Sequence, residues 1–288
     1  MQGTDAAKQV SAVDALAAHR QTRAGGVSMV WRTWGEGRPL LLLHGASGSW
    51  THWIRNVLPL AAHFRVLAPD MPGFGDSDTL SEPHTADRLT AAVVAGLDEI
   101  LPAPAELDLA GFSFRGIIGG LVAARLELRV RTLVLLGAGG LDLPFPPLPP
   151  LVRIEADAPP GEALRGHREN LHRLMIARAE RVDALALFVQ MENLRRARFR
   201  SGSIPTSDTL RLALPAVQAC ITGIWGSRDA FVGPYLDERR QLLGSFERAL
   251  DFRVIEGAGH WTTYEAAHDV NAILLDMLRE PGPSARGD

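Results

Sequence analysis

The sequence contains one cysteine, Cys220, among 288 residues. A single cysteine excludes an intrachain disulfide and a metal cluster built from cysteines. Because Cys220 lies in an apolar stretch, we interpret it as a small core residue and not as a nucleophile. The chain also lacks an HExxH pattern, a GxxxxGK[ST] phosphate loop and a correctly spaced GxGxxG fingerprint. We therefore expect no metal and no cofactor.

The first twenty residues lack the long apolar run of a signal peptide or a membrane helix. This absence predicts a cytoplasmic protein with no membrane partner. The formal net charge is −3, and no basic stripe is present that would neutralise phosphates, so we expect no nucleic-acid partner. The arginine-rich run 195–200 is interpreted as a solvated helix face. The expected partner is a small-molecule substrate with an apolar part, and the sequence is also compatible with a homo-oligomer.

Short apolar strands alternate with helical segments, which favours an α/β fold with a mostly parallel sheet. Hydrophobic residues make up 46% of the chain, enough for a full core. The expected strands are Val27–Trp34, Pro39–Leu43, Phe64–Ala68, Leu107–Ala110, Thr132–Leu136, Ala219–Trp225 and Phe252–Ile255. The expected helices are Thr85–Ile100, Arg115–Arg125 and Thr263–Leu278, beside an N-terminal extension over 1–25 that contains one helix.

This pattern is interrupted after the strand that ends at Leu136. Residues 141–151 (LDLPFPPLPPL) are too rich in proline for a helix or a central strand. About sixty mostly helical residues follow before the strands resume. We therefore predict a core made of 1–142 and 211–288, with a helical cap over 143–210. The tail from Pro281 is expected to be loose.

Ser113 lies between an expected strand and an expected helix, in the segment Gly111-Phe112-Ser113-Phe114-Arg115-Gly116. A strand-to-helix turn of this kind presents a serine hydroxyl at the edge of a sheet and directs the helix N-terminus at the reacting group. The common pattern is G-x-S-x-G, and Arg115 replaces its last glycine. Ser113 is thus a candidate nucleophile on an elbow that Arg115 could distort.

A serine nucleophile needs a base, and the base needs an acceptor that fixes its tautomer. His260 follows a strand on the glycine-rich loop Gly257-Ala258-Gly259-His260, and Asp229 follows the preceding strand. His268 is the rival base, but it lies inside the last helix. We therefore assign His260 as the general base and Asp229 as the residue that orients it.

Hydrolysis of a carbonyl compound also needs N–H donors for the developing oxyanion. The backbone N–H of Phe114, directly after the candidate nucleophile, is one candidate. The loop His44-Gly45-Ala46-Ser47-Gly48 supplies the second, the N–H of Ala46, while His44 itself is interpreted as structural.

These segments together resemble the α/β-hydrolase superfamily over nearly the whole chain. The matching stretches are HGASGSW (44–50), DMPGFGDSD (70–78), GFSFRG (111–116), WGSRDAFV (225–232) and GAGHW (257–261). The order Ser113, Asp229, His260 is the order found in that superfamily. The resemblance implies an α/β-hydrolase fold, with helices on both faces of the sheet and a helical cap insertion. Related dehalogenases and epoxide hydrolases carry aspartate where Ser113 stands.

A second, weaker resemblance is to the meta-cleavage-product hydrolases, which cleave a C–C bond in vinylogous 1,5-diketones. It is carried by 50–57 (WTHWIRNV), 137–141 (GAGGL) and His260-Trp261. That family usually has G-N-S-M-G-G at the elbow, where this chain has G-F-S-F-R-G. The resemblance implies a cap arginine for a substrate carboxylate, for which Arg195 or Arg196 is the candidate. It also implies substrate contacts by His52 and Trp261.

The sequence thus predicts a serine hydrolase for a carboxylic ester or a similar carbonyl compound. A meta-cleavage C–C hydrolase is the alternative within the same class. A ligand-binding protein on a hydrolase scaffold is the alternative of another class, because Arg115 could misplace Ser113. The apolar residues of the 143–210 segment fit either a substrate pocket or a core of that segment: Phe145, Leu148, Leu171, Leu174, Met175 and Phe188.

Overall fold

A computed structural model describes residues 2–23, 26–199 and 201–278. In this part of the chain one sheet has the strand order β1-β2-β4-β3-β5-β6-β7-β8. The strands are β1 (Ala18–Thr22), β2 (Met29–Trp34), β3 (Pro39–Leu43), β4 (Arg65–Pro69), β5 (Leu107–Phe112), β6 (Val130–Leu136), β7 (Cys220–Gly226) and β8 (Ala249–Ile255). Neighbours from β4 to β8 pair in parallel, whereas β1 with β2 and β2 with β4 pair antiparallel. The prediction of a mostly parallel sheet is confirmed.

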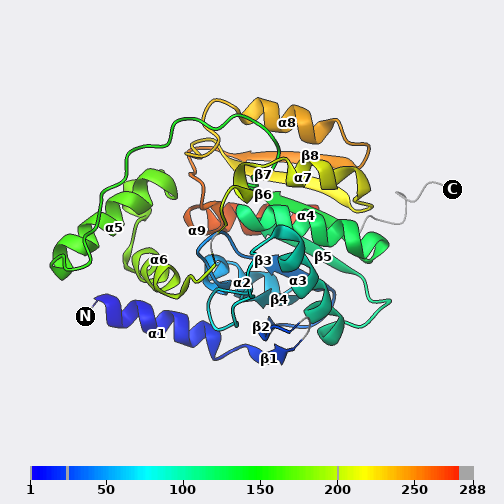
Figure 1. Cartoon of the computed structure of the whole chain (residues 1–288), viewed down its shortest axis with the longest axis horizontal. Coiled ribbons are helices and arrows are strands. Elements are labelled where there is room, and N and C mark those ends of the chain that lie inside the picture. The colour runs from blue at the N-terminus through cyan, green and yellow to red at the C-terminus, as the bar shows by residue number, and fades with distance from the viewer. Residues whose placement is uncertain (1, 24–25, 200, 279–288) are drawn as a thin grey trace.

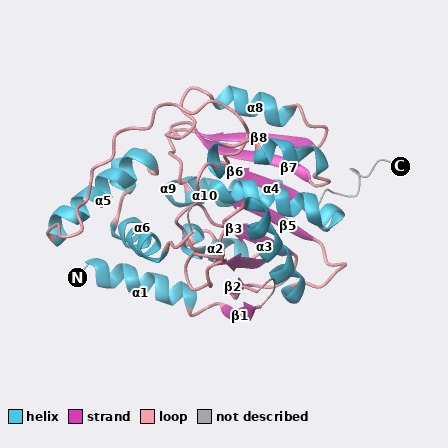
Figure 2. Cartoon of the chain, in the orientation of Figure 1, coloured by secondary structure: helices cyan, strands magenta, loops and turns pink. Residues whose placement is uncertain are grey.

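Both faces of the sheet are covered by helices (Figures 1 and 2). The helices are α1 (Gln2–Asp14), α2 (Val57–Ala61), α3 (Ala86–Ile100), α4 (Phe114–Leu126), α5 (Pro160–Leu174), α6 (Ala184–Arg196), α7 (Thr209–Ala213), α8 (Leu236–Gly244), α9 (Thr262–Glu265) and α10 (Ala267–Met277). Alternate residues of β3 point to opposite faces, as the period of a strand requires. Leu41 and Leu43 belong to the core layer that includes residues of α3, α4 and α8, whereas Leu40 and Leu42 belong to the layer that includes residues of α2, α9 and α10. The continuous leucine run is therefore buried on both sides.

The N-terminal extension contains the expected helix, α1, but also a strand that the sequence did not predict. Four of the five residues of β1 are exposed, so this edge strand has no apolar alternation to reveal it. Helix α1 packs along α6, which comes from the 143–210 segment (Figure 1).

Between β6 and β7 the chain forms α5, α6 and α7, and residues 143–159 are neither helix nor strand. Helix α5 begins at Pro160, where the missing N–H of proline costs nothing. Helix α7 crosses the predicted boundary at residue 210. Its Leu210 belongs to the core layer formed with α4, and the Leu210 N–H donates to the Gly140 carbonyl at 2.8 Å. The division at 142/143 and 210/211 stays a prediction.

The C-terminal part differs from the expectation in two places. Helix α8 was not predicted, because its sequence LDERRQLLG is mostly polar and short. The single helix expected over Thr263–Leu278 is divided into α9 and α10. The tail from Pro281 lies outside the described residues. In the described ranges no helix is both long and apolar enough to cross a membrane.

Candidate active site

Ser113 occupies a tight turn between β5 and α4, at the carboxyl edge of the sheet. Its backbone has φ 55° and ψ −124°, a conformation that non-glycine residues rarely adopt and that is common at functional sites. The Ser113 N–H donates to the Leu136 carbonyl at 2.7 Å, and the Gly116 N–H donates to the Ser113 carbonyl at 2.9 Å. These bonds hold the strained turn in place, with Ser113 at the N-terminus of α4.

Two glycines allow β5 and α4 to approach closely despite Arg115. A Cβ on Gly111 would lie 2.6 Å from the Arg115 carbonyl oxygen, and a Cβ on Gly116 would lie 2.5 Å from the Cβ of Ala138. Both distances are below van der Waals contact, so glycine is required at both positions. The turn therefore forms with arginine at the position that glycine usually occupies, because the close contacts fall on its neighbours.

Ser113, His260 and Asp229 are joined by hydrogen bonds. His260 Nε2 lies 2.8 Å from Ser113 Oγ, and His260 Nδ1 lies 2.7 Å from Asp229 Oδ2. The other carboxylate oxygen of Asp229 accepts from the Phe231 N–H at 2.9 Å. Since ionised Asp229 can only accept, His260 Nδ1 carries the proton and Nε2 is free to accept from the serine hydroxyl. The structure thus brings together the three residues that the sequence singled out.

The loops that carry Asp229 and His260 meet through backbone contacts. A Cβ on Gly226, the last residue of β7, would lie 2.2 Å from the Ala258 carbonyl oxygen. That carbonyl accepts from the Arg228 N–H at 2.9 Å. The glycine-rich character of both loops is what permits this contact.

Glu265, on α9, is a positioning residue that the sequence did not reveal. It is buried, and its carboxylate accepts from the Gly259 N–H at 2.7 Å, directly before His260. It also accepts from the N–H groups of Ala177 and Arg178 at 3.0 and 2.8 Å. A glutamate at the end of a strand–loop–helix unit carries no sequence signal for this role, because Ala177 and Arg178 lie almost ninety residues away in the chain.

A cavity of about 170 Å³ opens beside Ser113 and His260. Its lining is mostly apolar: Ala46, Phe112, Ser113, Phe114, Gly137, Ala138, Gly139, Phe145, Met175, Pro205, Phe231, Val232, Arg239 and His260. Ala46 and Phe114, the expected oxyanion donors, both belong to it. Within the described part of the chain, neither of their N–H groups donates to another group. Both are therefore available to a ligand oxygen.

The loop that carries Ala46 is held from behind by two buried histidines. His44 Nε2 accepts from the Met71 N–H at 3.0 Å, so His44 Nδ1 carries a proton and donates to the Gly45 carbonyl at 2.8 Å. His52 Nδ1 accepts from the Gly45 N–H at 3.1 Å. His44 thus has the structural contacts expected of it. His52 packs against the same loop.

Arg115 lies behind the same loop and is fully buried. Its Nη1 lies 3.5 Å from the Gly45 carbonyl oxygen, and its guanidinium carbon lies 4.1 and 4.3 Å from the ring centres of Phe74 and Phe114. Burial lowers the pKa of Arg115, although arginine keeps its proton in proteins. Burial, and then the charge of Arg115, lower the pKa of His44 well below its usual value and that of His52 to about 3.

The low pKa of His52 predicts a loss of stability in acid. Between pH 6.5 and about 3 the unfolded chain binds a proton at His52 that the folded chain does not. The free energy of unfolding should therefore fall by about 1.4 kcal/mol for each pH unit below 6.5 from this group alone. Urea unfolding at pH 7.5 and pH 4.5 measures the fall.

The matched control for this prediction is His52→Gln, whose side-chain carbonyl can still accept from the Gly45 N–H. The fall in the wild-type protein should exceed that of the variant by about 2.5 kcal/mol. Equal falls in the two proteins would show that His52 does not remain neutral in the folded state.

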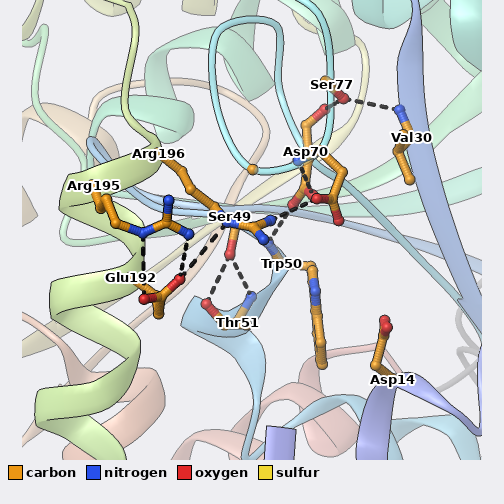
Figure 3. Close-up of polar contacts among 12 residues, drawn as sticks. Asp14, Val30, Ser49, Trp50, Thr51, Asp70, Ser77, Glu192, Arg195 and Arg196 are labelled. Atoms are coloured by element: carbon orange, nitrogen blue, oxygen red, sulfur yellow. Dashed lines mark hydrogen bonds and ion pairs between the residues drawn. The ribbon is translucent and has the colours of Figure 1, made fainter. Parts of the chain in front are cut away.

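The residues expected to bind substrate do not line the cavity. His52 and Trp261 are buried and pack together with ring centres 5.0 Å apart, and the Trp261 indole N–H donates to the His52 carbonyl at 3.0 Å. Arg195 is exposed on α6 and pairs with Glu192 at 2.8 Å (Figure 3). Its neighbour Arg196 pairs with Asp76 at 2.5 Å. Their roles in substrate binding stay predictions.

The remaining candidates are also placed. His268, the rival base, is exposed on α10 and lies 3.4 Å from Asp269. Cys220 is half-buried at the start of β7. Of the apolar residues in the 143–210 segment, Phe145 and Met175 line the cavity, whereas Leu171 is part of the core and Leu148 is exposed.

Comparison with known proteins extends these observations. The sequence profile of the "Alpha/beta hydrolase family" matches residues 40–273. The chain is 29% identical over 263 residues to a 2-hydroxy-6-oxo-6-phenylhexa-2,4-dienoate hydrolase of Burkholderia cepacia, covering 85% of this chain and 88% of that protein. It is 30% identical over 281 residues to the dihydrolipoyllysine-residue acetyltransferase component of an acetoin cleaving system of Pseudomonas putida, covering 91% and 70%. The structure of a meta-cleavage product hydrolase from Pseudomonas fluorescens shares the fold, with a TM-score of 0.68 at 22% identity and coverages of 89% and 96%.

Proposed function

The chain belongs to the alpha/beta hydrolase family, and we propose that it is a serine hydrolase acting on a carboxylic ester or a similar carbonyl compound. The observation that carries the proposal is the relay from Ser113 Oγ through His260 to Asp229, with distances of 2.8 and 2.7 Å. The relay borders a mostly apolar cavity, which supports a small substrate with an apolar part.

In the proposed reaction His260 Nε2 takes the hydroxyl proton of Ser113 while Oγ bonds to the substrate carbonyl carbon. The carbonyl π electrons move onto oxygen, and the N–H groups of Ala46 and Phe114 stabilise the resulting oxyanion. His260 then gives the proton to the leaving group, and an acyl group remains on Ser113. Water, deprotonated by His260, releases the acid in the same way. Asp229 stabilises the imidazolium in both halves.

The 143–210 segment contributes to the proposed substrate pocket. Phe145, Met175 and Pro205 line the cavity, and all three come from this segment. This supports the idea that the segment acts as a cap whose residues limit the size of the acyl or leaving group. It also supports an apolar substrate part.

Labelling with a fluorophosphonate probe, located by peptide mass spectrometry, tests the nucleophile without a choice of substrate. We expect one label on Ser113 because only an activated serine attacks the probe. The label should be absent in His260→Ala and retained in His268→Ala, which removes the exposed rival histidine. A folded wild-type protein that takes no label would contradict the proposal and favour a ligand-binding protein.

A C–C bond hydrolase of the meta-cleavage type is the second candidate, and a specific observation favours it. The Burkholderia cepacia relative is a dienoate hydrolase that matches 85% of this chain. Comparing turnover of short p-nitrophenyl esters with turnover of a yellow dienoate distinguishes the two. Faster turnover of the dienoate by several orders of magnitude would replace the ester assignment.

A further inference from the structure

The peptide group between Gly45 and Ala46 connects a buried charge to the reaction cavity. In a trans peptide the carbonyl oxygen of one residue and the N–H of the next point in opposite directions. The Gly45 carbonyl points to the buried side, where it accepts from His44 Nδ1 at 2.8 Å and lies 3.5 Å from Arg115 Nη1. The Ala46 N–H therefore points away from these donors, and Ala46 lines the cavity.

Arg115 is the unusual member of this arrangement. Within the described part of the chain no carboxylate acts on its charge, and its Nε and Nη2 have no hydrogen-bond acceptor. The groups around it are two aromatic rings, the Gly45 carbonyl and two histidines whose pKa values burial depresses. An unpaired buried charge is costly, so stability alone does not account for an arginine here.

We propose that Arg115 is a positioning residue for catalysis: its guanidinium orients and polarises the Gly45–Ala46 peptide so that the Ala46 N–H binds the oxyanion formed at Ser113. The inference rests on the proposed serine mechanism. A cation at the carbonyl end of a peptide group makes its N–H a stronger donor, because linked hydrogen bonds polarise one another. The field of the cation in this buried region also favours negative charge on the substrate oxygen.

This contribution is made in the transition state and hardly at all in the ground state. The substrate carbonyl is neutral when it binds, and full negative charge develops only when Oγ has bonded to carbon. Loss of Arg115 should therefore lower kcat and leave KM nearly unchanged. Removal of one whole oxyanion donor costs about 100- to 1,000-fold in kcat. Loss of the group that only polarises a donor should cost less, about tenfold.

The test compares Arg115→Met, which removes the charge, with Arg115→Lys, which keeps it. The control is Arg38→Met, which removes a partly buried arginine at the opposite end of β3, where it pairs with buried Asp108 at 2.7 Å. For each protein, kcat and KM are measured with p-nitrophenyl butyrate. Inhibition is measured with butylboronic acid, whose tetrahedral adduct on Ser113 resembles the oxyanion, and with butyramide, whose neutral carbonyl resembles the ground state.

For Arg115→Met we expect an about tenfold lower kcat and an about tenfold higher inhibition constant for butylboronic acid, with KM and butyramide inhibition changed less than about twofold. Its Tm should be unchanged or higher, since a methionine carries no charge to bury. Arg115→Lys should keep kcat within about threefold of wild type. Arg38→Met should lower Tm and leave kcat unchanged. If Arg115 had only a structural role, Arg115→Met would lower Tm, as Arg38→Met does. A lower kcat at an unchanged or higher Tm therefore distinguishes the two roles.

The proposal is overturned if folded Arg115→Met has wild-type kcat and boronate inhibition, or if Arg115→Met behaves like Arg38→Met. It is also overturned if Arg115→Lys folds normally and yet loses tenfold in kcat. A wild-type protein that neither hydrolyses p-nitrophenyl butyrate nor binds butylboronic acid would overturn the serine mechanism itself. That result is distinct from an active wild type in which Arg115 is dispensable.

Discussion

Replacing Ser113 with alanine is expected to lower kcat by about four to six orders of magnitude. The reason is the relay: without Oγ, the base His260 has no proton to take and the substrate has no nucleophile to attack it. Because the three residues act as a unit, the double variant Ser113→Ala with His260→Ala should be no slower than the single one. Turnover of p-nitrophenyl esters is measured for the single and the double variant, at enzyme concentrations high enough to detect the residual activity.

Ser245→Ala is the matched control, since Ser245 is an exposed serine at the end of α8 whose hydroxyl donates to the Leu242 carbonyl at 2.7 Å. It should retain wild-type turnover. If Ser113→Ala kept more than a hundredth of the wild-type kcat, another group would have to be the nucleophile. If the double variant were far slower than the single one, the relay would not act as a unit.

Replacing Arg32 with methionine should have the largest effect on stability. Arg32 is buried on β2 and donates to Asp14, Asp70 and Asp76 at 2.5, 3.0 and 2.6 Å. Asp70, drawn in Figure 3, is also buried and accepts from the Trp50 N–H at 2.9 Å. Without Arg32 the Asp70 charge has no cation beside it. Loss of one partner of a buried ion pair costs about 3–5 kcal/mol, which urea unfolding at pH 7.5 would measure.

Two further variants identify the cause of this loss. Arg125→Met breaks the exposed pair with Asp87 and should cost about 1 kcal/mol or less. Adding Asp70→Asn to Arg32→Met should recover part of the lost free energy of unfolding, because the double variant has no unpaired charge at position 70. Burial raises the pKa of Asp70, so lower pH should also reduce the deficit of Arg32→Met by protonating this group. A deficit that neither Asp70→Asn nor acid reduces would refute the explanation.

Sequence patterns identified strands β2 to β8 and the three residues of the relay because both depend on local signals. Each apolar run forms a strand, and Ser113, Asp229 and His260 follow the ends of parallel strands, which lie at one edge of a sheet. The same logic explains why β1 was missed: an exposed edge strand has no apolar period.

The position of a side chain depends on packing between distant segments, which sequence patterns do not show. His52 and Trp261 are buried against each other from positions more than two hundred residues apart, and their expected contact with substrate stays a prediction. Arg195 was a candidate for the cap arginine that the resemblance implies, and it pairs with Glu192 on the same helix. The sequence left open whether Arg115 distorts the elbow. The close contacts fall on Gly111 and Gly116, so the elbow forms with arginine in place.

The Glu265 carboxylate has a consequence for how this enzyme could change its substrate. One oxygen accepts both from the residue before His260 and from Ala177, so residues 177–178 and the catalytic loop share a single anchor. We expect mutations near 177–178 to shift His260 along with the pocket wall. Phe145 and Pro205 line the same cavity and, in the described part of the chain, are not hydrogen-bond partners of Glu265. An evolving or engineered variant can therefore reshape the pocket at those two positions and leave the proton-transfer geometry intact.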